Sequence, residues 1–263
     1  MPFTGSHPAA VLPLMRLGLV PSALVIGSMA PDLPYYLPLS IDSAKTHSPV
    51  GVFGIDLLLG LLAYAVWRVL VGPLAVAIAP AALRARLPRW VRFRWSADPG
   101  PALLVIASLI AGAATHVLWD EFTHIHRWGY RHVGWLAARH GPMEGYRWAQ
   151  YGSGVIGGLL IALAVRSWWR SAAVTRPAPP SALAPGPVVV VLVSVGLATL
   201  AGVGAAVART MMQDTGIRRG LFLVATWGGG AGLVAVLLAA VLCGRSLDRS
   251  AHTATTDREE QTA

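Results

Sequence analysis

The chain has 263 residues, of which 55% are hydrophobic and only 13% are charged. Soluble domains carry about 25% charged residues, so this composition excludes an ordinary water-soluble globule. The net charge of +9 comes mainly from arginines between the apolar runs, which indicates loops that face lipid headgroups and excludes a nucleic-acid groove.

The first apolar segment, residues 8–30, is interrupted by two prolines and a glycine, and Pro31 disfavours helix at its end. We expect two short helices, each of about a dozen residues or fewer and therefore under ~20 Å long. Neither piece can cross a bilayer alone, so the sequence predicts a short N-terminal helical hairpin. The alternative is a single bent crossing, which would place His7 and Asp32 on opposite sides of the membrane.

Five apolar runs follow that are long enough, or nearly so, to cross the ~30 Å hydrocarbon layer, which takes about 20 helical residues. They lack the alternation of barrel strands, and the helix is the other structure that satisfies its own backbone in lipid. The sequence therefore predicts an all-α integral membrane bundle, a multi-pass protein of the cell membrane. The expected spans are residues 50–72, 101–119, 152–169, 188–208 and 220–243.

The segments between and after the spans divide the chain into four parts. Residues 1–170 hold the hairpin, three spans and all the candidate metal ligands. Residues 171–187 are rich in Pro, Ala and Ser and form a linker, and residues 188–244 hold two further spans. Residues 245–263 form a polar tail that we expect to be disordered. The arginine-rich connection 84–99 is the best candidate for a cytoplasmic loop.

His and Asp residues gather at one end of the predicted bundle. His47 lies just ahead of the first span, where Ser48 is expected to cap the helix, and His116 and Asp120 lie at the far end of the second span. Because successive spans are antiparallel, these residues meet at one membrane face. His116 and Asp120 are four residues apart and share one helical face, so their side chains can hold the same divalent cation.

Two further candidate ligands precede the first span. Asp32 lies in a loop held by flanking prolines, and His7 lies at a helix start. Taken singly, each has a plainer interpretation, with Asp32 as a turn residue, His7 as a helix cap and His116 as a hydrogen-bonded histidine of the bundle. Together the expected metal ligands are His7, Asp32, His47, His116 and Asp120. These ligand types suit zinc, manganese or iron better than magnesium, and Cys243, the single cysteine, excludes a thiolate cluster.

Asp120 and Glu121 are the candidate catalytic residues. Glu121 is a candidate general base or supporting partner, although it points some 100° away from Asp120 on the helix, and Arg127 could hold an anionic group of the substrate. For both, the competing interpretation is a solvated charge at the interface. Asp56 lies inside the first span, where an acid is costly, and is expected to pair with a neighbouring helix. The aromatic residues between positions 129 and 151 form either an interfacial belt or a lid over the site.

Several short motifs resemble a known family. They are the opening MPFTGSHPA, GSMAPD at residues 27–32, THS at residues 46–48 and the pair His116 and Asp120. These motifs are similar to a bacterial multi-pass membrane family catalogued as domain of unknown function 4184, which implies a membrane location and no particular reaction.

A fainter similarity joins this family to membrane-bound metal-dependent hydrolases regulated by the SOS response. That similarity implies metal-ligand roles for the same five residues. Pro34 stands where those proteins have a second acid, and no His-Arg pair precedes Thr46. Because one acid of that motif is missing, we expect one metal or none instead of a two-metal site.

We therefore expect a metal-dependent hydrolase embedded in a bacterial cell membrane. Its partners would be the lipid bilayer and a lipid-like or phosphorylated substrate with a phosphoester or similar bond. One alternative is a transporter or channel subunit whose path uses Asp56 and His116. Another is a non-catalytic membrane scaffold in which the His and Asp residues cap helices. Convergence of the five donors on one point would favour the enzyme.

Overall fold

The computed structural model describes residues 4–37, 39–87, 99–175, 178, 181–213 and 216–262, with side chains up to residue 244. Residues 88–98 of the arginine-rich connection and four residues of the expected linker lie outside the described residues. The chain forms two compact units, one of Met1–Ala65 with Trp95–Ser171 and one of Val66–Arg94 with Ala172–Ala263. The described residues 66–87 thus belong to the second unit, whereas the four-part division from the sequence, which stays a prediction, places them in the first part.

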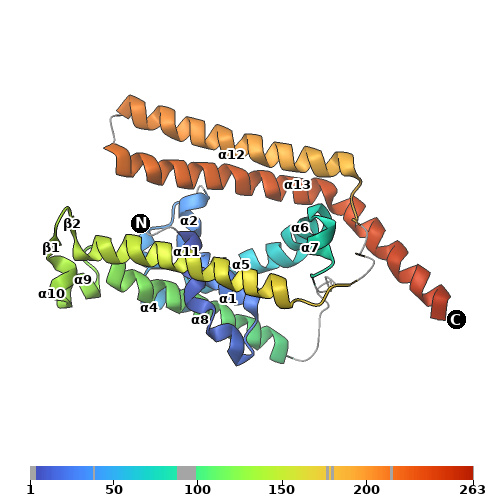
Figure 1. The fold of residues 1–263 in the computed structure, drawn as a ribbon, viewed down its shortest axis with the longest axis horizontal. Helices are drawn as coiled ribbons and strands as arrows, with labels where there is room; N and C mark the ends of the chain where they lie inside the picture. Colours follow the sequence, from blue (N-terminus) through green and yellow to red (C-terminus); the bar gives the residue numbers. More distant parts are fainter. Residues whose placement is uncertain are drawn as a thin grey trace. The chain divides into compact units, whose positions relative to one another are not determined.

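The first unit is built from helices, with one short β hairpin among its described residues (Figure 1). Its N-terminal elements are η1 (Thr4–Val11), η2 (Leu14–Leu17), α1 (Pro21–Met29), η3 (Ala30–Asp32), α2 (Leu33–Tyr36), α3 (Ser43–Thr46), α4 (Pro49–Phe53) and α5 (Ile55–Val66). Its later elements are α8 (Gly100–Thr123), α9 (Trp128–His132), α10 (Gly134–Ala137), the antiparallel strands β1 (Arg139–His140) and β2 (Met143–Glu144), and α11 (Gly145–Ser171). The N-terminal hairpin therefore consists of 3₁₀ turns followed by the short helix α1.

The start of α4 follows from its own sequence, as expected. The Ser48 hydroxyl accepts a hydrogen bond from the Gly51 N–H at 3.0 Å, and Pro49 occupies the first helical position. His47 lies just before this cap and ends α3. The cap therefore fixes where α4 begins, and with it the position of His47 just before the helix.

Helices α1 and α8 pack closely because glycines face each other at their contact. A Cβ on Gly27 would overlap the backbone of Leu109, and a Cβ on Gly112 would overlap the backbone of Leu24 and Ser28. Small residues permit this approach between helices in lipid. The contact brings the C-terminal end of α1 against the middle of α8, one turn from His116.

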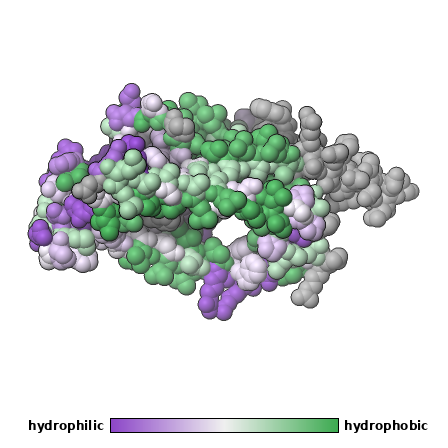
Figure 2. Space-filling model, turned by 90° about the horizontal axis from the view of Figure 1, so that it is seen from above, coloured by the Kyte–Doolittle hydropathy of each residue, from purple (hydrophilic) through white to green (hydrophobic). Residues whose placement is uncertain are grey.

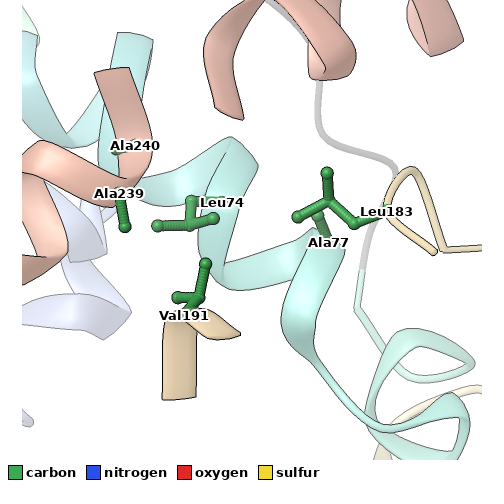
Figure 3. Packing of buried hydrophobic residues seen from close by; sticks show 6 residues of the cluster. All are labelled: Leu74, Ala77, Leu183, Val191, Ala239 and Ala240. Carbon is green, nitrogen blue, oxygen red and sulfur yellow. The ribbon is translucent and has the colours of Figure 1, made fainter. Parts of the chain in front are cut away.

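The described part of the second unit consists of the π-helical turn η4 (Trp67–Val71) and the helices α6 (Gly72–Ile78), α7 (Ala81–Arg84), α12 (Pro185–Gln213) and α13 (Gly216–Thr262). Helices α12 and α13 lie side by side (Figure 1). A small apolar core joins α6 to the two long helices (Figure 3), and it consists of Leu74, Ala77, Leu183, Val191, Ala239 and Ala240. The backbone of residues 245–262, for which we expected a disordered tail, continues α13.

Among the described residues, five helices are long and apolar enough to cross a membrane, which confirms the predicted all-α fold class. They are Ile55–Ile78, Gly100–His132, Gly145–Ser171, Pro185–Gln213 and Gly216–Gly244. Many of their leucine and valine side chains are exposed, and apolar residues cover much of the face shown in Figure 2. Such a surface is unfavourable in water and suited to lipid. The protein is therefore a multi-pass membrane protein.

Candidate metal centre

The structure brings together all five side chains that the sequence singled out as metal ligands. They come from four separate segments of the first unit, and each is at most 4% exposed. His7 belongs to η1, Asp32 to η3, His47 to the end of α3, and His116 and Asp120 to α8. The hairpin therefore returns His7 and Asp32 to the same place, as the hairpin interpretation requires and the single bent crossing does not.

Four of the donor atoms have the spacing of ligands around one cation. His47 Nε2 lies 3.2 Å from Asp32 Oδ1 and 3.4 Å from Asp120 Oδ2. His116 Nε2 lies 3.7 and 3.6 Å from the same two oxygens, and the two Nε2 atoms are 3.4 Å apart. Ligand atoms bound tetrahedrally to zinc at about 2.0–2.1 Å are roughly 3.3 Å apart. The donors therefore need little movement to reach a shared ion.

Backbone carbonyls orient two of the imidazole rings. The Nδ1 of His116 is 2.7 Å from the Ser28 carbonyl oxygen, and the Nδ1 of His47 is 3.1 Å from the Ser43 carbonyl oxygen. Since a carbonyl only accepts hydrogen bonds, each Nδ1 carries the proton and donates it. The Nε2 lone pair of each ring is then free to face the cluster, which is the tautomer that a ligating histidine needs.

His7 is held in the cluster by ring packing. Its ring stacks on that of His116 with centroids 3.8 Å apart, and its Nε2 lies 3.8 Å from Asp120 Oδ1. Among the described residues, neither ring nitrogen of His7 has a hydrogen-bond partner, nor does Asp32 Oδ1. Buried polar atoms almost always have a hydrogen-bond partner, so these three atoms without one indicate a ligand.

Burial and neighbouring groups set the protonation states of two donors. Burial, together with the nearby His116 ring, lowers the pKa of His7 to about 4. Burial acts to raise the pKa of Asp32, but the adjacent His47 and His116 rings and the Thr4 hydroxyl outweigh it and hold that pKa below its usual range. At neutral pH His7 is therefore neutral and Asp32 is ionised, the states in which both bind metals.

Glu121, expected as a catalytic base, lies outside the cluster of five donors. Its Oε2 accepts a hydrogen bond from the Trp128 N–H at 2.8 Å, and its Oε1 lies 3.5 Å from Arg127. Arg127 in turn donates to the His47 carbonyl at 2.7 Å. Glu121 therefore supports the loop after α8, and Arg127 connects that loop to the cluster.

Asp56 differs from the expectation that it pairs with a neighbouring helix. Its side chain is 1% exposed, and among the described residues neither of its oxygens has a hydrogen-bond partner. It lies four residues from Val52 and four from Gly60, both of which contact α8. It also interacts electrostatically with His47.

Several residues around the donors were missed from the sequence. The Thr4 hydroxyl donates to Asp32 Oδ2 at 2.6 Å, and the Tyr36 hydroxyl donates to Thr4 at 3.1 Å. Thr4 and Ser28 belong to the family motifs quoted above, and this membership is the feature of the sequence that could have identified them as part of the site. His124 directly follows the last residue of α8, and its Nδ1 is 3.3 Å from Asp120 Oδ1.

Comparison with known proteins identifies one matching family. A family model described as domain of unknown function (DUF4184) matches residues 1–241, a range that includes all five donors. The comparisons with curated proteins and with solved structures give no match.

Proposed function

We propose that this chain, which belongs to the family of domain of unknown function 4184, is a metal-dependent hydrolase of a bacterial plasma membrane. The observation that carries the proposal is the meeting of three imidazoles and two carboxylates in one buried cluster. The substrate would contain a phosphoester or similar bond and a lipid-like part.

The donors fit a divalent cation better than they fit an ordinary polar cluster. The Nε2 lone pairs of His47 and His116 face each other and the oxygens of two carboxylates at 3.2–3.7 Å. Lone pairs this close repel unless a cation or a proton lies between them, and burial increases the repulsion. Imidazole and carboxylate ligands together favour zinc, manganese or iron(II).

The position of the site suits metal-assisted hydrolysis of an amphiphilic substrate. A bound divalent ion would lower the pKa of a water ligand and polarise a phosphoryl or carbonyl oxygen. Asp120 lies in the last turn of α8. Arg127 places a guanidinium beside His47, where it can bind an anionic group.

Metal analysis of the full chain purified in detergent tests the proposal. We expect a stoichiometric transition metal in the unmutated protein, and its loss in the variants His116→Ala and Asp120→Ala. His132→Ala is the matched control, because His132 lies in α9 and bonds to the Trp128 carbonyl at 2.8 Å. Absence of stoichiometric metal from the unmutated chain would defeat the proposal. The metal-loaded chain should also hydrolyse a chromogenic phosphodiester in lipid–detergent micelles.

Asp56 favours transport as a second candidate function. An unpartnered carboxylate inside a spanning helix is costly and is often part of an ion path. The chain also leaves helical geometry at Gly54, between α4 and α5, and α5 is followed by the π-helical turn η4. Proteoliposomes that contain the chain can be tested for uptake of protons or zinc ions. If Asp56→Asn abolishes this flux while the metal stoichiometry is retained, transport would be favoured over hydrolysis.

A further inference from the structure

The two oxygens of Asp120 face different histidines. Oδ2 lies 3.4 Å from His47 Nε2 and 3.6 Å from His116 Nε2. Oδ1 lies 3.3 Å from His124 Nδ1 and 3.8 Å from His7 Nε2. Each oxygen therefore has its own pair of imidazole nitrogens, as in a carboxylate that bridges two cations.

The stacking of His7 on His116 supports the same arrangement. The two rings are 3.8 Å apart and nearly parallel, with an angle of 15° between their planes. Both present Nε2 to the Asp120 carboxylate, one to each oxygen. Cations bound in line with two such rings would be separated by about the ring spacing, and two-metal sites have separations of about 3.5–4 Å.

One cation leaves part of the cluster unexplained. An ion held by His47, His116, Asp32 and Asp120 already has four protein ligands, the usual number for a closed zinc site. His7 would then remain 1% exposed, with neither ring nitrogen hydrogen-bonded to a described residue. Leaving a buried polar group unsatisfied is unfavourable, which argues for a ligand at His7.

His124 has the surroundings of a ligating histidine. Its Nδ1 faces Asp120 Oδ1, and its Nε2 lies 3.5 Å from the side-chain amide of Gln150, which is itself buried. The two ends of an amide exchange by rotation, so Gln150 can accept the Nε2 proton. Such an outer partner is typical of histidines whose other nitrogen binds a metal. At 23% exposure, the His124 side chain lies on the accessible side of the cluster.

We infer that the cluster binds two divalent cations bridged by Asp120, and that His7 and His124 hold the second cation. The inference rests on the proposed metal site but not on hydrolysis. Two divalent cations against the carboxylates of Asp32 and Asp120 leave a net positive charge, which suits an anionic phosphoester.

Manganese loading of the full chain in detergent tests the inference. The protein is stripped with a chelator, reloaded with Mn²⁺, desalted and analysed for bound metal and by electron paramagnetic resonance. We expect two ions per chain with the exchange-coupled spectrum of a close pair. His124→Ala should retain one ion with an uncoupled spectrum, as should His7→Ala. His140→Ala is the control, since His140 bonds to the Trp135 carbonyl in the β hairpin and should keep both ions.

Each other outcome has a definite meaning. One ion per unmutated chain would overturn the second site and leave the proposed function intact. No ion would overturn both. Two uncoupled ions, or two ions retained in His124→Ala, would refute the bridged pair held by His124. Loss of both ions in His124→Ala, in protein that still elutes as a folded species, would refute a separate second site.

Discussion

Replacing Gly112 by alanine should damage the metal centre without changing any ligand. An added Cβ would lie 2.7 Å from the Ser28 nitrogen and 2.9 Å from the Gly27 carbonyl carbon, and still closer to the Leu24 carbonyl oxygen. Ordinary contacts between such atoms are about 3.5 Å, so α1 and α8 must separate by roughly 1 Å.

That separation acts on the cluster in two ways. The Ser28 carbonyl accepts the His116 Nδ1 proton at 2.7 Å, and a shift of about 1 Å would break this bond. It would also move Asp32, which follows α1, away from Asp120 on α8. Outer partners of metal ligands are worth about 10–100-fold in affinity, and overpacking costs about 1–3 kcal/mol of stability.

Gly158→Ala provides the matched control, because Gly158 is also inside a spanning helix but has nothing within 4 Å of an added Cβ. Zinc affinity is measured by competition with a chromophoric chelator, and stability by thermal unfolding in detergent. We expect a 10–100-fold loss of affinity and a lower unfolding temperature for Gly112→Ala only. Equal affinity and stability in the two variants would refute the argument that this glycine contact positions the site.

Three further predictions follow from single contacts. Thr4→Val removes the hydroxyl that donates to Asp32 at 2.6 Å and should weaken zinc binding about tenfold, whereas Thr4→Ser should not; the same chelator competition measures both. Without metal, the free energy of unfolding should fall by about 3 kcal/mol as the pH decreases from about 6.5 to about 4. The reason is that in this pH range His7, whose pKa is lowered in the folded chain, takes up a proton only when the chain unfolds. Thermal unfolding measured at several pH values should show this loss of stability, and His7→Leu should remove it. Ser48→Ala deletes the cap bond from Gly51 and should cost about 1 kcal/mol, which Ser48→Asp should recover in the same unfolding assay.

The sequence alone was sufficient for the class of fold and for the local geometry of α8. In lipid the backbone must bond within its own segment, so apolar runs of sufficient length predict spanning helices before any packing is known. The helical period likewise places His116 and Asp120 on one face. The Ser48 cap also depends only on neighbouring residues, and the structure confirms it.

Tertiary structure decided which distant residues meet. His7 and Asp32 could have lain on either side of the membrane, and the return of the hairpin depends on the close contact of α1 with α8 at their glycines. The same packing stacks His7 on His116 and leaves the Asp56 oxygens without a hydrogen-bond partner among the described residues. The loop after α8 takes Glu121 away from the donors. Such contacts between segments far apart in the chain leave no periodic signal, because they arise from the fit of whole surfaces and not from the spacing of residues along one helix.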